Sequence, residues 1–261
     1  MTGQRTLQFR FRTLLIATFV VAVPCAWIGR DFWRARRERP VIAMIRAQGG
    51  QIAYQHESTS LFSGFRYPVQ LDDWPGFKLE RFLFGDDLRA TVAFVYLPIT
   101  DPSDPALQSL PSLSHLRVVH LTGPGVTDES MDEIVRNRGI QTLHLHNTLV
   151  TPDGLSRLAS LPKLESISLE GESITDDGLT PLSRFPVLHR LDIVSTQITI
   201  KGLLSLVNHP TIRHISVNSS DKLSREDIDQ FQQQWPSCQV DYWQTEPDGS
   251  GWPVGLYPDR P

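Results

Sequence analysis

The stretch LESISLEGESITDDGLTPLSRFP, residues 164–186, decides how this sequence folds. Its first half places Ile167 and Leu169 two positions apart, which is the period of a β-strand with one buried face. Its second half holds three large apolar residues spaced by three positions, as on one side of a helix. A Thr175-Asp176 pair stands between the halves. The stretch therefore predicts a short strand, a turn and a helix that carries the chain back to the next strand.

The apolar triplet at the start of this stretch recurs every 24 residues, in six units. One such unit cannot bury its apolar side chains alone, so stacked units must share one core. The triplets are Val92-Val95-Leu97, Leu116-Val119-Leu121, Ile140-Leu143-Leu145, Leu164-Ile167-Leu169, Leu188-Leu191-Ile193 and Ile212-Ile215-Val217. The sixth unit carries a one-residue slip at Leu223-Ile228-Phe231, and Cys238-Val240-Tyr242 predicts a closing strand.

A β-branched residue and a polar pair follow the triplet in most units, as in Thr127-Asp128 and Thr175-Asp176. We expect the Thr or the Asp to cap the helix that follows, because its side-chain oxygen can accept a free backbone N–H there. The fifth unit departs from the pattern, with Ile200 in the place of the Asp.

The repeated unit, LxxLxLxxTxITDxGLxxLxxLP, resembles the leucine-rich repeat of ribonuclease-inhibitor-like proteins and of F-box ubiquitin-ligase receptors. Leu164 to Pro186 matches it almost letter for letter, and the resemblance covers roughly residues 92–243. It implies an α/β fold: a right-handed leucine-rich-repeat solenoid, shaped as a short horseshoe, with a parallel β-sheet on the concave face and helices on the convex face. Such a motif specifies a fold rather than a task.

Residues 13–29, TLLIATFVVAVPCAWIG, contain no charged side chain. Arg10 and Arg12 precede them and Arg30 follows. A helix of this length spans about 25 Å, near the ~30 Å of a bilayer core, and flanking Arg side chains can reach the headgroups. We therefore expect one transmembrane helix, a signal-anchor, before the repeats. The alternative is a cleaved signal peptide, for which Pro24 makes a poor cleavage site.

An Arg-flanked anchor followed by these repeats resembles membrane-anchored repeat proteins of planctomycete bacteria. Three Arg precede the apolar run and five follow it. This balance favours a cytoplasmic body only weakly, so the side of the membrane that the repeats face stays open.

The chain accordingly divides into five expected parts. They are a basic N-terminal segment at 1–12, a transmembrane helix at 13–29, a juxtamembrane helix and N-terminal cap at 30–91, leucine-rich repeats with a closing strand at 92–243, and a disordered tail at 244–261. Within the cap we expect a helix at Val41–Ala47 that Gly49-Gly50 ends, a strand at Gln51–His56 and a short helix at Leu79–Phe84.

Charge is distributed unevenly along the chain. Residues 1–39 hold eight Arg against Asp31 and Glu38, a net charge of +6, so a total of −4 leaves −10 for the remainder. An acidic body argues against nucleic-acid binding, which requires a basic footprint. The two cysteines, Cys25 and Cys238, are far apart in the chain and indicate no disulfide framework.

The residues between the core positions of each strand should share one face of the sheet, in columns about 4.8 Å apart across neighbouring strands. Aromatic, Arg and His side chains gathered on such a face favour the binding of a partner protein, whose identity the sequence leaves unknown. The candidate contact residues are Phe94, Tyr96, Val118, His120, Thr142, His144, His146, Ser168, Glu170, Arg190, Asp192 and His214.

Other functions have weaker support in the sequence. His120, His144 and His146 should lie together near Glu170 and could bind zinc in a metal-dependent enzyme, but no HExxH spacing accompanies them. No P-loop, GxGxxG, GxSxG or CxxC motif is present, so we expect neither an enzyme nor a cofactor. An adaptor that recruits substrates, by analogy with F-box receptors, and a structural spacer at the cell surface remain as alternatives.

Overall fold

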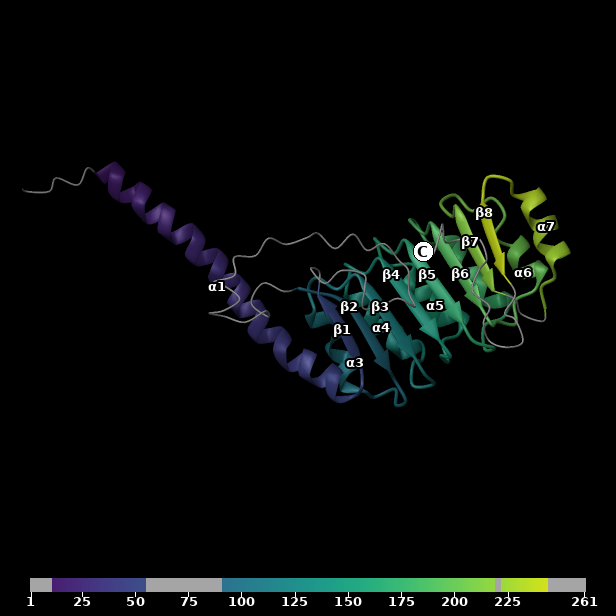
Figure 1. Cartoon of the computed structure of the whole chain (residues 1–261), viewed down its shortest axis with the longest axis horizontal. Coiled ribbons are helices and arrows are strands. Elements are labelled where there is room, and N and C mark those ends of the chain that lie inside the picture. The colour runs from purple at the N-terminus through teal and green to yellow at the C-terminus, as the bar shows by residue number, and fades with distance from the viewer. Residues whose placement is uncertain (1–10, 55–90, 219–221, 244–261) are drawn as a thin grey trace, which may run out of the picture.

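Each repeated unit forms one strand of a single sheet in a computed structural model, which describes residues 11–54, 91–218 and 222–243. The sheet has eight strands whose spatial order follows the chain, and helices alternate with them (Figure 1), so the fold is α/β. The strands are β1 (Gln51–Tyr54), β2 (Val92–Pro98), β3 (Val118–Thr122), β4 (Thr142–His146), β5 (Ser166–Glu170), β6 (Arg190–Val194), β7 (His214–Asn218) and β8 (Gln239–Trp243).

The sheet is mixed rather than purely parallel. Strands β2 to β8 run parallel to one another, but β1 pairs antiparallel with β2, with Gln51 opposite Tyr96. The expectation of a parallel sheet is therefore wrong at its N-terminal edge. The reason is that β1 lies outside the repeat, so the period that sets the direction of the other strands does not act on it.

The 24-residue period is kept in the pairing of the strands. Phe94 lies opposite Val118, and Val118 lies opposite Thr142, so equivalent residues of successive units are neighbours in the sheet. The pairing changes only at the end, where His214 lies opposite Gln239, 25 positions later. The one-residue slip expected in the sixth unit is thereby confirmed.

Helical segments return the chain between the strands, and those of neighbouring units contact each other. They are α3 (Pro105–Ser109), η3 (Leu110–Ser112), α4 (Asp128–Arg136), α5 (Pro152–Leu158), η4 (Asp176–Arg184), α6 (Ile200–Leu204) and α7 (Arg225–Gln234). The segment η4 is a 3-10 helix with Pro181 inside it. A proline has no N–H to give an α-helical hydrogen bond, and spacing by three suits the tighter 3-10 turn.

The core lies between the sheet and these helices. Every residue of the six apolar triplets is at most 1% exposed. The end of α1 joins the same core through Val41, Ile42 and Ile45. Burial of this extent supplies the main favourable term in folding, about 1.5–3 kcal/mol for each large apolar side chain.

The Thr and the Asp that follow a triplet make different contacts: the Thr caps the helix of its own unit, and the Asp bonds to the next unit. Thr151 and Thr199 are helix N-caps, and each side chain accepts a backbone N–H at 3.2 Å. Asp128 instead bonds to the following unit: its carboxylate accepts from Thr151 N at 2.7 Å and from Thr151 Oγ1 at 2.6 Å. Asp176 binds Thr199 in the same way. We call these two contacts the Asp–Thr bridges.

Helix α1 (Phe11–Ala47) is continuous and about 55 Å long, and its first half extends away from the sheet (Figure 1). It ends where expected, before Gly49, whose φ of 75° lets the chain turn into β1. In the described part of the chain, no helix combines the length and the apolar character needed to cross a membrane. Within the expected span at 13–29, the side chains of residues 13–17, 19, 21, 24, 25, 27 and 28 lie outside that part, as do the expected helix at Leu79–Phe84 and the tail at 244–261.

Two glycines leave room for the Asp–Thr bridges. A Cβ on Gly154 would meet the Asp128 carboxylate, and one on Gly202 would meet that of Asp176. Because each carboxylate is already fixed by its Thr, we expect Gly154→Ala and Gly202→Ala each to lower the free energy of unfolding by about 1–3 kcal/mol. Denaturant titration of the purified protein measures this loss.

The matched control is Gly178→Ala, at the equivalent position of the unit between them. A Cβ there meets Ile174 at 3.6 Å, an ordinary contact, so stability should be unchanged or rise by up to about 1 kcal/mol. An equal loss in all three variants would contradict the steric role of the bridges.

Candidate functional site: the polar face of the sheet

The face of the sheet turned away from the triplets carries three columns of side chains, and we call it the polar face. The register places them as the sequence predicts. The first column is Phe94, Val118, Thr142, Ser166, Arg190 and His214; the second is Tyr96, His120, His144, Ser168, Asp192 and Ser216; the third is Pro98, Thr122, His146, Glu170 and Val194.

The three columns differ in how deeply their side chains are buried. In the second column His120 is 4% exposed, His144 5% and Asp192 6%. Val118 of the first column is also buried. The other candidate residues are partly exposed: Phe94, Tyr96, Thr142, His146, Ser168, Glu170, Arg190 and His214. The candidates therefore separate into a buried row that supports the surface and flanking rows that a partner can touch.

Aromatic rings form a row across β2, β3 and β4. The ring of Tyr96 meets His120 edge-on at 5.0 Å between centroids, and His120 lies 5.3 Å from His144 and 6.3 Å from His146. Burial lowers the pKa of His120 to about 3, helped by the nearby His144 and His146, and burial lowers the pKa of His144 to about 4. At neutral pH both buried imidazoles are uncharged, so they pack here as neutral rings.

The planes of these rings are tilted by 38° and 40° in the two His pairs. Within residues 11–54, 91–218 and 222–243, no group of three or more His, Cys, Asp or Glu side chains could hold a metal ion.

Polar contacts anchor the side chains of the flanking columns. His146 Nδ1 lies 2.7 Å from Glu170 Oε2, Arg190 Nε lies 3.1 Å from Asp192 Oδ1, and His214 Nε2 lies 3.1 Å from Asp241 Oδ2. The two His contacts join neighbouring strands, whereas Arg190 and Asp192 both belong to β6. The contact with Asp192 leaves Arg190 about one-third exposed, with its guanidinium held in a defined direction.

Asp241 is a member of the polar face that the sequence reasoning missed. It lies opposite Ser216 and so extends the second column onto β8. The one-residue slip hides it from a count by 24, although adding that slip to the count would have found it. Burial lowers the pKa of His214 and Arg190 lowers it further, against the opposing charges of Asp241 and Asp192.

No protein-family model matches the sequence, and no curated protein matches it significantly.

Because the imidazoles of His120 and His144 are buried, we expect acid to destabilise the fold. In the unfolded chain a histidine takes up its proton near pH 6.5, whereas His144 and His120 resist protonation until about pH 4 and about pH 3. Below pH 6.5 the unfolded state therefore binds more protons, and stability falls as the pH falls. We expect a loss of roughly 1–2 kcal/mol for each of the two histidines between pH 7 and pH 5.

Denaturant titrations at pH 7, 6 and 5 measure this slope. The double variant His120→Gln, His144→Gln should flatten it, whereas the control His189→Gln, at an exposed position, should retain it. A slope that is unchanged in the double variant would refute the assignment to this buried pair.

Proposed function

We propose that this protein is a membrane-anchored leucine-rich-repeat protein that binds a partner protein through its polar face. Support for the repeat class comes from the constant 24-residue register of the strands and from the triplet motif that carries it. In that class the units wind as a right-handed solenoid, with the sheet on the concave side and the helices on the convex side. A concave sheet face is the usual recognition surface of a solenoid.

The observation that carries the binding proposal is the pattern of the polar face. A buried row of rings and carboxylates fixes the flanking side chains, so that His146, Glu170, Arg190 and His214 are presented in defined positions. Such preorganisation lowers the entropy lost when a partner binds. Among the partly exposed charged groups, the carboxylates of Glu170 and Asp241 outnumber Arg190, which favours a partner surface with basic groups.

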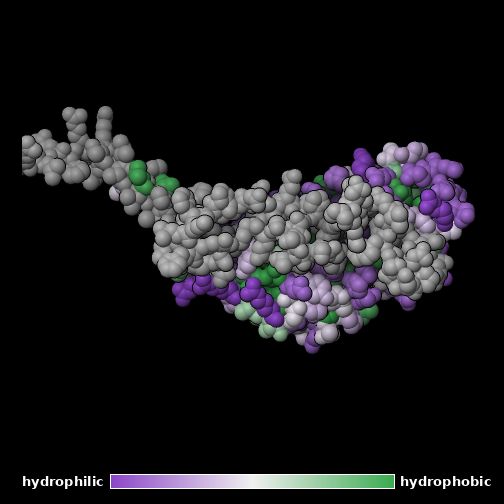
Figure 2. Space-filling model, viewed as in Figure 1, coloured by the Kyte–Doolittle hydropathy of each residue, from purple (hydrophilic) through white to green (hydrophobic). Residues whose placement is uncertain are grey.

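Support for the anchor comes from α1. Val20 is 65% exposed and Val23 is 43% exposed on the part of the helix that extends from the body, where Figure 2 shows apolar surface. Both belong to the uncharged run at 13–29. Apolar side chains gathered on a projecting helix are stabilised by an apolar surrounding, and a bilayer provides one. The protein is thus proposed to sit in a membrane by α1, with the side that the repeats face left open.

Site-specific photocrosslinking in membranes of the native host tests the binding proposal. A photoreactive residue replaces His146 or Arg190 on the polar face, or Asp177 or Lys201, which are exposed on the helical side. We expect one and the same partner to crosslink from both polar-face positions and from neither helical position. The charge reversal Glu170→Arg should reduce the yield from the Arg190 position severalfold, because it sets a positive charge against the basic groups of the partner.

The outcome also decides between this proposal and a structural spacer. Crosslinking of equal yield from both sides of the sheet, or its persistence in the Glu170→Arg variant, would show that the polar face is not the binding surface. Circular dichroism of each variant confirms that the fold is retained.

A further inference from the structure

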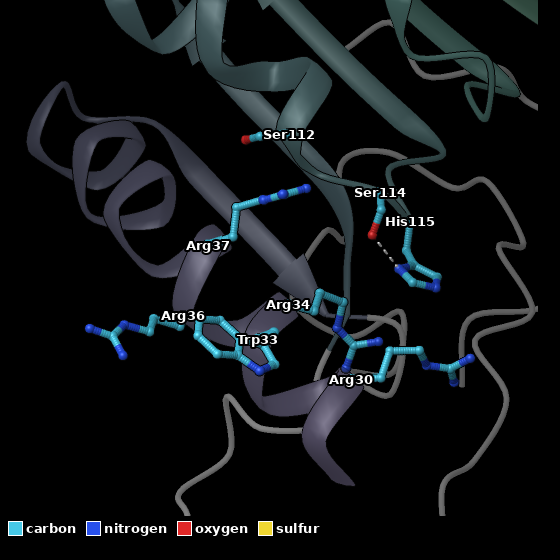
Figure 3. Close-up of a pocket in the computed structure, with 8 residues that line it drawn as sticks. All are labelled: Arg30, Trp33, Arg34, Arg36, Arg37, Ser112, Ser114 and His115. Atoms are coloured by element: carbon cyan, nitrogen blue, oxygen red, sulfur yellow. Dashed lines mark hydrogen bonds between the residues drawn. The ribbon is translucent and has the colours of Figure 1, made fainter. Parts of the chain in front are cut away.

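A basic cavity lies between α1 and the loop that precedes β3. Its volume is about 730 Å³, and α1 lines it with Arg30, Arg34 and Arg37 (Figure 3). These arginines follow one another at four and three positions, so they project from one side of the helix. They fall immediately after the apolar run at 13–29.

The opposite wall comes from the last residue of η3 and the chain that follows it. It contributes the hydroxyls of Ser112 and Ser114 and the imidazole of His115. Ser114 Oγ lies 2.9 Å from His115 Nδ1 and donates to Glu38 Oε1 at 3.3 Å. Glu38 is 3% exposed, and burial raises its pKa. This contact ties the loop to α1, so both walls of the cavity are held together.

Aromatic and cationic groups mark the rim. Arg36 lies over the ring of Trp33, with 6.0 Å from its guanidinium carbon to the ring centroid. Trp33 is 68% exposed and Phe32 49% exposed, and Figure 3 places Trp33 and Arg36 together beside the cavity. Exposed Trp beside Arg is typical of the interface between lipid and water.

The chemistry of the lining selects a ligand class. Guanidinium groups donate paired hydrogen bonds to phosphate oxygens. The hydroxyls of Ser112 and Ser114 already donate to Ser109 O at 2.6 Å and to Glu38 Oε1, so the arginines are the principal donors here. No Asp or Glu is among the described residues that line the cavity, and Glu38 lies behind Ser114, so the charges that face a bound anion are positive. A phosphate group, rather than a metal ion or an apolar molecule, matches this set.

The position of the cavity selects the source of the phosphate. Along a helix axis, Arg30 lies about 1.5 Å and Arg34 about 7.5 Å beyond Gly29, the last residue of the apolar run. The headgroup layer of a bilayer is about 5–8 Å thick on each side. If residues 13–29 fill the hydrocarbon core, both arginines lie at the depth of the lipid phosphates, and Arg37 lies just above them.

We propose that this cavity binds the phosphate of an anionic phospholipid headgroup, with Arg30, Arg34 and Arg37 as its principal ligands. The inference rests on the proposed membrane anchoring. A bound lipid joins α1 to the loop before β3 and so fixes the repeat body relative to the bilayer surface. Membrane attachment and body orientation then depend on different residues.

Native mass spectrometry of the full chain in non-ionic detergent tests the proposal, with phosphatidic acid, phosphatidylglycerol and zwitterionic phosphatidylcholine as probes. We expect the two anionic lipids to bind at least about tenfold more tightly than phosphatidylcholine. The variant Arg30→Gln, Arg34→Gln, Arg37→Gln should lose this preference. The single variant Arg37→Gln, at an exposed position, should weaken it measurably even if the triple variant folds poorly.

The matched control is Arg136→Gln, Arg138→Gln, Arg184→Gln, which removes the same charge from exposed positions of the repeat body. It should keep the lipid preference. Equal binding by the pocket variants and the control would overturn the proposal. Displacement of the lipid by millimolar inorganic phosphate would overturn the lipid as source, because the site would then serve the free anion.

A separate experiment tests whether α1 anchors the chain in a membrane. Alkaline extraction of cell membranes reports whether α1 holds the chain in the bilayer, and the micelle experiment does not depend on that result. A chain that is released by alkali but still prefers anionic lipid would refute the anchor alone.

Discussion

The structure depends on one constraint: a unit of 24 residues cannot bury its own apolar side chains, so each unit must be completed by its neighbours. Every triplet residue is at most 1% exposed because the strands pair without a change of register from β2 to β7. The turn after the strand obeys the same period, with positive φ at Gly123, Asn147, Gly171 and Ser195. The Asp–Thr bridges then join units at the start of their helical segments.

What the sequence could predict follows from this constraint. The columns of the polar face were predictable because a fixed period determines which side chains are neighbours. The direction of β1 and the place of Asp241 were not, since both lie outside the period. Alternation also tells which face a residue occupies but not its depth, so the burial of His120 and His144 required the packed structure. The proline inside η4 was visible, whereas the bridging role of Asp128 depends on a contact 23 positions away.

Polar groups in this protein are organised by burial. On the polar face, the buried ring of His120 packs beside His146 and the buried carboxylate of Asp192 pairs with Arg190, which keeps His146 and Arg190 partly exposed and oriented. At the other end of the chain, Glu38 is buried beneath the basic cavity and is bonded to Ser114. In both places an interior polar group fixes a charged surface group. The proposed partner surface and the proposed lipid site therefore each rest on side chains whose freedom is already reduced.

The short length of β1 has a consequence for self-association. The edge of a sheet presents unpaired backbone N–H and C=O groups, which can pair with a second copy of the chain. Strand β1 has four residues, whereas β2 has seven, so the sheet ends on a shorter edge than β2 would give it. Two copies laid end to end would share only a short ladder, which weakens the joint from which a fibre of stacked solenoids would grow.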